Sequence, residues 1–332
     1  MTQPRTASVL VDLSAAIVSV HHEQPVCLTV APGDAEELAS LPFGPFYPAQ
    51  HRTMEIGLRQ WVTEQAGLDI GYVEQLYTFG DRGRRIEADT GDTHVVSVGY
   101  LALSRENQQT ENWHNWYLHF PWEDWRQGRP LVLQENILPR LYDWAGDDAK
   151  ALSRINQAFG TPVSSSDTAS GAASGISSHK TQTPTWDDER VLERYELMYE
   201  AGLIFESFAD GRLPSAPETL AGMAMQLDHR RILATAISRL RAKLKYRPVV
   251  FEFMPPQFTL TQLQKTTEAV IGAALHKQNF RRLLAKNGLV EATGAQSRAR
   301  GRPAELYRFR HDARDSHALP GFRISVRQKP SA

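Results

Sequence analysis

The chain has 332 residues, of which 41% are apolar and 23% are charged, and its formal net charge is −1. These values are typical of a soluble protein with about two domains. Its one cysteine, Cys27, excludes an intrachain disulfide framework and a zinc site made of several thiolates. No stretch approaches the ~20 apolar residues of a membrane helix. The apolar N-terminal run is interrupted by Asp12, so we interpret it as a buried strand rather than a signal sequence and expect a cytoplasmic protein.

The first 150 residues alternate between patterns typical of strands and of helices. Apolar and β-branched runs predict strands at 9–20, 25–31, 71–79, 94–104 and 112–122. Helical spacing predicts one helix at 51–66, stopped by Gly67, and a second at 131–146. A long polar loop, "GDRGRRIEADTGD", lies between two of the strands, and such loops often hold ligands. We therefore expect an α/β or α+β domain over residues 1–150.

The middle of the chain predicts a flexible insertion followed by helices. Residues 160–185 are small, polar and rich in serine, a composition that buries too little surface to fold. We place the insertion at 151–186. A helix is predicted at 187–208, where Asp187 and Asp188 favour its N-terminus, and an amphipathic helix is predicted at 229–246. We assign residues 187–247 to helices that connect the domains and contribute to a dimer.

Residues 248–332 show the pattern of a winged helix-turn-helix. Thr259 stands three residues before Gln262, the spacing of a helix-capping box. A second helix is predicted at 276–286, ended by Asn287-Gly288. Strand-like runs at 289–293 and 304–310 enclose a basic loop. A helix, a turn, a basic helix and a basic hairpin together form a DNA-reading module.

Charge supports this interpretation independently. Residues 229–310 contain 17 Lys and Arg against 4 Asp and Glu, a net of +13, which leaves a net of −14 on the rest of the chain. Because the excess covers helix, turn and hairpin alike, we interpret it as a phosphate-binding surface rather than the solvated face of one helix. The same balance argues against a winged helix that contacts only proteins.

Two sets of motifs carry a family resemblance. The segment "LRQWVTEQAGL" resembles a decayed Nudix box. A close resemblance to the Nudix-related transcriptional regulators of NAD metabolism is carried by three further segments, "DHRRILATAISRLRAKLKYRPVVFEFMPPQFTLTQLQ", "HKQNFRRLLAKNGLVEATG" and "RGRPAELYRF". The resemblance is specific from 228 to 309 and loose from 9 to 145. It implies an α+β chain in which a Nudix-like α/β/α sandwich domain precedes a winged helix-turn-helix domain. The Ser-rich stretch has no counterpart in the short members of this family.

The candidate Nudix box departs from the family pattern at most of its acidic positions. The family pattern G-x5-E-x7-R-E-U-x-E-E-x-G-U supplies carboxylates that hold Mg²⁺. With its last glycine on Gly67, the four acidic positions fall on Arg52, Trp61, Glu64 and Gln65. One carboxylate is a poor Mg²⁺ site, so we predict no catalytic residues, no metal and no enzymatic activity. The alternative is a Mg²⁺-dependent Nudix-type nucleotide hydrolase with an atypical metal site, using Glu64 with carboxylates outside the box.

The resemblance also implies a nucleotide effector, ADP-ribose or another NAD-related nucleotide, and no required cofactor. Arg52 and Arg82 are candidates for the pyrophosphate, and Tyr77 or Phe79 for stacking on adenine, with Glu64 as a further effector residue. Aromatic residues in such strands more often belong to the core.

For DNA contact we select polar and basic residues of the second helix and of the wing. An asparagine can read an adenine edge, and an arginine can read guanine or bind phosphate. The candidates are Lys277, Asn279, Arg281, Arg282, Arg300 and Arg302. Winged-helix regulators usually bind two half-sites as dimers. We therefore expect a homodimer that binds a palindromic operator in double-stranded DNA, and the family resemblance implies that it is a repressor of NAD-metabolism genes.

Overall fold

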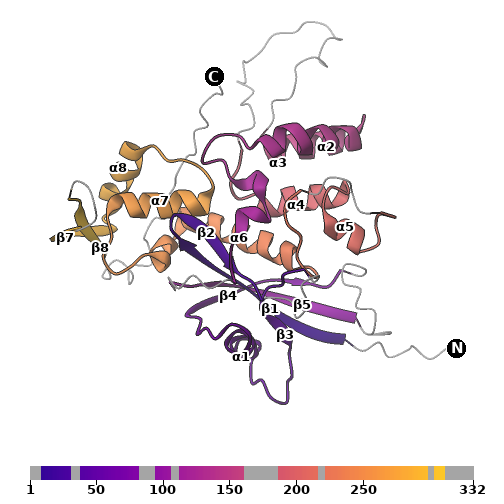
Figure 1. Ribbon diagram of the computed structural model, residues 1–332, viewed down its shortest axis with the longest axis horizontal. Coiled ribbons are helices and arrows are strands. Elements are labelled where there is room, and N and C mark those ends of the chain that lie inside the picture. The colour runs from indigo at the N-terminus through magenta and orange to yellow at the C-terminus, as the bar shows by residue number, and fades with distance from the viewer. Residues whose placement is uncertain are drawn as a thin grey trace, which may run out of the picture.

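The N-terminal part of the chain is built on a six-stranded mixed sheet (Figure 1). The computed structural model describes residues 9–30, 38–81, 94–105, 112–160, 186–215, 221–297 and 303–310. The strand order is β4-β5-β1-β2-β6, and β3 also pairs with β1. The bounds are β1 Val9–His21, β2 Gln24–Leu28, β3 Phe43–Pro45, β4 Tyr72–Phe79, β5 His94–Leu103 and β6 Trp113–Asn115. The two long central strands, β1 and β5, run parallel, whereas β2 and β3 pair with β1 antiparallel.

Helices cover both faces of this sheet, which explains why β1 is buried along most of its length. Helix α1 (Met54–Ala66) packs on one face and α6 (His229–Tyr246) on the other. Side chains of β1 alternate between the two cores. Leu13 and Ile17 join the core under α1, whereas Ala16 and Val18 join the core that contains α6. The predicted α/β/α sandwich is therefore confirmed, and α6 forms its second helical layer rather than a connection outside it.

Two predicted elements are shorter than expected. The predicted strand at 112–122 ends at Asn115, whose side chain accepts a hydrogen bond from the Tyr117 N–H at 2.9 Å and starts a 3₁₀ turn. Burial of Trp116, Phe120 and Trp122 then holds the chain in two such turns. The predicted helix at 187–208 is divided into α4 (Val191–Glu200) and α5 (Phe205–Ala209), because Gly202 adopts a positive φ of 72° between them.

The insertion expected at 151–186 begins with ordered structure. After the predicted helix, seen as a π-helical turn (Leu133–Ile137) and α2 (Leu138–Ala145), a further helix α3 spans Ala149–Phe159. Asp148 caps α3, and Ile155 and Phe159 are fully buried. The prediction of flexibility is therefore wrong for 151–159, because these apolar residues find a core contributed by other segments. The Ser-rich part, residues 161–185, lies outside the described residues.

The C-terminal part forms the predicted winged helix. It comprises the 3₁₀ turn Val249–Phe253, α7 (Leu260–Ile271), α8 (Lys277–Asn287) and the antiparallel strands β7 (Val290–Gln296) and β8 (Glu305–Phe309). The backbones of Phe258 and Tyr307 exchange two hydrogen bonds and tie the segment before α7 to the wing. The predicted capping box at the start of α7 is present. Among the helices that the structure describes, none has both the length and the apolarity needed to cross a membrane.

We expect Thr259→Ala to lower the free energy of unfolding by about 1 kcal/mol, because it removes the hydroxyl that accepts the Gln262 N–H at 3.1 Å. Chemical denaturation followed by circular dichroism measures the change. Thr261→Ala, two residues later on the exposed side of α7, is the control, and equal effects of the two substitutions would contradict the capping role.

Candidate effector site and nucleic-acid interface

Helix α1 uses the degenerate box positions to hold its neighbouring strand. The Trp61 indole N–H donates to the Pro45 carbonyl at 3.0 Å. The Gln65 amide exchanges two hydrogen bonds with the Phe43 backbone, at 3.0 and 2.6 Å. Trp61 and Gln65, which stand at positions that are acidic in the family pattern, therefore hold β3 against α1. The remaining box carboxylate, Glu64, accepts a hydrogen bond from Gln60 at 2.8 Å on the exposed side of the helix.

The donor set at this helix does not fit a Nudix-type Mg²⁺ centre. Mg²⁺ requires several oxygen ligands in a near-octahedral arrangement, whereas Trp61 and Gln65 are committed to the backbone of β3. Across the part of the chain that the structure describes, no group of three or more His, Cys, Asp and Glu side chains is placed to hold a metal ion. Arg59, which falls on the box arginine if the family pattern is shifted by one residue, is hydrogen-bonded to Glu55 and to the carbonyls of Ile70 and Gly71.

The predicted effector residues differ in accessibility. Arg52 is exposed just before α1, and Tyr77 on β4 is 66% exposed. Phe79 is only 6% exposed, and the Arg231 guanidinium lies 5.2 Å from its ring centroid. This burial favours a core role for Phe79 over stacking on adenine. Arg82 lies outside the described residues, immediately after Asp81, which pairs with Arg231 of α6 at 2.7 Å.

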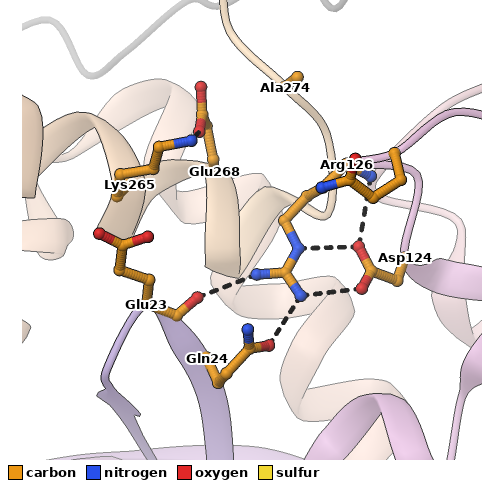
Figure 2. A pocket seen from close by; sticks show the side chains of 8 residues that line it. Glu23, Gln24, Asp124, Arg126, Lys265, Glu268 and Ala274 are labelled. Carbon is orange, nitrogen blue, oxygen red and sulfur yellow. Dashed lines mark hydrogen bonds and ion pairs between the residues drawn. The ribbon is translucent and has the colours of Figure 1, made fainter.

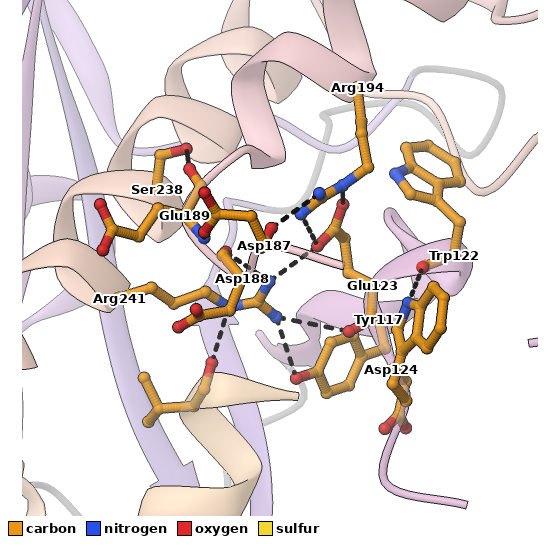
Figure 3. A network of polar contacts seen from close by, with 12 residues as sticks. Tyr117, Trp122, Glu123, Asp124, Asp187, Asp188, Glu189, Arg194, Ser238 and Arg241 are labelled. Atoms are coloured by element: carbon orange, nitrogen blue, oxygen red, sulfur yellow. Dashed lines mark hydrogen bonds and ion pairs between the residues drawn. The ribbon is translucent and has the colours of Figure 1, made fainter. Parts of the chain in front are cut away.

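A buried ionic cluster joins the sandwich to the winged helix (Figure 3). Glu123 is fully buried, and its carboxylate accepts hydrogen bonds from Arg194 of α4 at 2.5 and 2.8 Å and from Arg241 of α6 at 2.7 Å. Burial alone would raise the pKa of Glu123, but the charges and hydrogen bonds of the two arginines outweigh it and hold this pKa below its ordinary value. Sequence reasoning missed this cluster, because the three residues are separated by 71 and 118 positions.

The same cluster binds the C-terminal end of α7. Arg241 Nε donates to the Val270 carbonyl at 2.9 Å, and the Tyr117 hydroxyl donates to the Ala269 carbonyl at 2.8 Å. The Trp125 N–H donates to the Gly272 carbonyl at 2.6 Å. Gly272 has a φ of 79°, and a side chain there would overlap the Glu123 carbonyl. The first helix of the helix-turn-helix is therefore bonded directly to the sandwich.

A polar cleft of about 400 Å³ lies beside this joint, between the β1–β2 turn, the 124–127 loop and α7 (Figure 2). Arg126 reaches across it and pairs with Asp124 at 2.8 Å, the Glu23 carbonyl at 2.9 Å and the Gln24 side chain at 2.8 Å. Lys265 pairs with Glu268 at 2.9 Å. These charges satisfy one another, so the cleft offers no unpaired arginine or lysine for a nucleotide pyrophosphate.

Much of the predicted basic surface is paired inside the protein. The basic residues of α6 bind acidic groups elsewhere in the chain, which corrects the interpretation of the +13 excess as one phosphate-binding surface. The pairs are Arg230–Glu206, Arg231–Glu196, Arg231–Asp81, Arg239–Glu74, Arg241–Glu123, Lys243–Glu74, Lys245–Asp188 and Lys245–Glu189. The stretch from Phe258 to Arg310 still carries 10 Lys and Arg against 3 Asp and Glu.

Helix α8 exposes the predicted DNA-binding residues. Phe280 and Leu284 are buried against the rest of the winged helix, whereas Lys277, Asn279, Arg281 and Arg282 are all exposed. None of these four is held in an ion pair by a carboxylate of the described residues, so the cations remain available to an external anion. Arg300 and Arg302 lie outside the described residues. In the hairpin, Arg308 of β8 pairs with Glu291 of β7 at 2.5 Å.

We expect Glu123→Gln to lower the free energy of unfolding by about 3 to 5 kcal/mol, because it leaves two buried guanidinium groups without a compensating charge. The pKa of Glu123 is lower in the folded chain than in the unfolded chain. Its contribution is therefore complete above the ordinary value of 4.5 and is lost as the pH falls through the folded pKa.

Urea denaturation of both proteins over a pH series measures this contribution. The difference in stability between wild type and variant should shrink as the pH falls below 4.5. Glu135→Gln, at an exposed glutamate, is the control. A constant difference across the acidic range would show that Glu123 does not act through its charge.

Comparison with known proteins agrees with this architecture. Residues 250–309 match the family model of the NrtR DNA-binding winged helix domain. Over 85 residues the chain is 42% identical to the ADPR responsive transcriptional repressor NtrR of Acinetobacter baylyi, a match covering 26% of this chain and 34% of that protein. The matched part thus spans about a third of the length of this curated relative.

Solved structures show a similar fold over most of the chain. The crystal structure of Shewanella oneidensis NrtR has a TM-score of 0.50 at 18% identity, covering 94% of this chain and 99% of that one. A MutT/nudix family protein from Enterococcus faecalis has a TM-score of 0.48 at 15% identity, covering 92% and 89%. Residues 250–309 therefore match the NrtR winged helix domain, and the chain as a whole shares the fold of the Shewanella oneidensis NrtR structure.

Proposed function

We propose that this protein is a DNA-binding transcriptional repressor controlled by a nucleotide effector such as ADP-ribose. The observation that carries the proposal is α8, an exposed basic helix on an NrtR-type winged helix, whose cations are not neutralised by described carboxylates. Exposed Lys and Arg side chains on such a helix bind DNA phosphates and base edges in the major groove. The relative from Acinetobacter baylyi, named as an ADPR responsive transcriptional repressor, supports the same function.

The effector is proposed to bind the sandwich without being hydrolysed. Two box positions that are acidic in a Nudix hydrolase are Trp61 and Gln65 here, and both hold β3. Arg52, Glu64 and Tyr77 present exposed polar and aromatic groups, and Arg82 extends this set beyond the described part. We keep these four residues as the effector site and assign Phe79 to the core that supports it.

Helix α6 is the element through which the two sites communicate in this proposal. Near its N-terminus, Arg231 pairs with Asp81 at the edge of the polar loop. Further along, Arg241 binds the end of α7. A movement of the polar loop can therefore be transmitted along α6 to the helix-turn-helix. We further propose that the protein acts in the cytoplasm as a homodimer on a palindromic operator of NAD-metabolism genes.

We expect the double substitution Lys277→Ala with Arg281→Ala to weaken binding to a labelled operator and to reduce its salt dependence. Each lost phosphate contact lowers the slope of log K against log salt by about 0.9, so the slope should become less steep by roughly 2. Fluorescence anisotropy over a salt series measures both quantities. Lys150→Ala, an exposed lysine on α3, is the control, and an unchanged slope in the double variant would remove these residues from the interface.

We expect ADP-ribose to change the affinity of the wild-type protein for its operator and Arg52→Ala to weaken this response, because a cation that binds the pyrophosphate is lost. The measurement is the same anisotropy titration with and without ADP-ribose. Incubation with Mg²⁺ should leave the ADP-ribose intact. Turnover of ADP-ribose that disappears in Glu64→Gln would instead support a hydrolase.

A further inference from the structure

The exposed face of α8 is not centred on the residues that composition alone suggests. Successive side chains on an α-helix are rotated by about 100°. Phe280 and Leu284 are buried, and Leu283 and Asn287 are half-buried, which defines the inner side of α8. On the opposite side of the helix axis from these four residues lie Gln278 and Arg282. Lys277 and Asn279 therefore lie toward the margins of the exposed face.

The side chains on this face also differ in their contacts. Asn279 Oδ1 accepts a hydrogen bond from Arg282 Nη2 at 3.4 Å. The acceptor that Asn279 would present to an adenine amino group is thus shared with its neighbour. Gln278 is exposed, and its amide forms no hydrogen bond within the described residues. It retains both the donor and the acceptor that a bidentate contact to adenine requires.

Position along the helix favours the same residue. Gln278 is the second residue of α8, in the N-terminal turn that contacts base edges in helix-turn-helix proteins. Arg282 follows one turn later, about 6 Å along the helix axis. Since base pairs are separated by ~3.4 Å, the two side chains are spaced to reach bases that are one or two steps apart.

We infer that Gln278 reads an adenine in the major groove and that Arg282, oriented by Asn279, reads a guanine one or two base pairs away. This inference rests on the proposed DNA-binding function and specifies the sequence class that the operator must contain. In this arrangement Asn279 is a positioning residue for Arg282, whereas Lys277 and Arg281 flank the reading face and bind phosphates.

The test is selection of binding sites from a random double-stranded DNA library with the full-length protein, followed by anisotropy on every single-base variant of the selected half-site. Wild type should select an A·T pair and a G·C pair that are adjacent or separated by one pair. Gln278→Ala should lose the preference for adenine, which we expect to be roughly 5- to 150-fold in wild type. The guanine preference and the salt slope should stay unchanged. Gln157→Ala, an exposed glutamine on α3, should behave as wild type.

The second arm compares Asn279→Ala with Arg282→Ala. Both should weaken the guanine preference and leave the adenine preference intact, with the larger effect for Arg282→Ala. If wild type selects a defined site but Gln278→Ala retains every base preference, the inference is overturned while the proposed function stands. If wild type binds all sequences equally, the proposed regulator itself fails.

Discussion

The contact on which the two-domain arrangement depends is the buried carboxylate of Glu123 between Arg194 and Arg241. Placing three charges in the core is costly unless each is fully hydrogen-bonded. Here the guanidinium groups also bind carbonyls of Ala158, Asp187, Asp188 and Val270. The cluster is thus satisfied only when α4, α6 and the end of α7 are all in place. It favours one position of the winged helix relative to the sheet over the alternatives that apolar packing alone would allow.

This joint limits how the winged helix can move relative to the sandwich. The helix-turn-helix begins with α7, and the C-terminal end of α7 is bonded to the sandwich through Tyr117, Trp125 and Arg241. Rotation of the winged helix by itself would break these buried hydrogen bonds, and each unsatisfied group would carry its desolvation cost. In the proposed regulator, a signal from the sandwich would therefore reach the winged helix by movement of α6 and α7 together rather than through a loose hinge between independent domains.

Helix α1 shows how residues at box positions can serve the packing of the fold. A carboxylate at position 61 or 65 could not donate a hydrogen bond to a carbonyl of β3, whereas the Trp61 indole and the Gln65 amide do so. These side chains stabilise the contact between β3 and α1 and remove the oxygen ligands that a divalent cation needs. The helix still borders the surface where Arg52 and Glu64 are exposed.

Local sequence signals determined the elements whose stability is local. The Thr259–Gln262 capping box, the glycines that end α1 and α8, and the apolar periodicity of α6 all identified helices correctly, because caps and amphipathic faces depend on residues near in sequence. The segment from Phe258 to Arg310 was likewise recognisable as a winged helix from its order of elements. Composition also marked its basic character.

Only the tertiary structure decided which charges are available and which aromatic residues are buried. The arginines of α6 resemble a DNA-binding surface in the sequence, yet their partners lie on β4, α4 and the 116–123 turns, far away in the chain. Phe79 and Tyr77 belong to the same strand, but α6 covers one and leaves the other exposed. Pairing and burial are properties of the packed layers, and a sequence pattern records only which residues are capable of them.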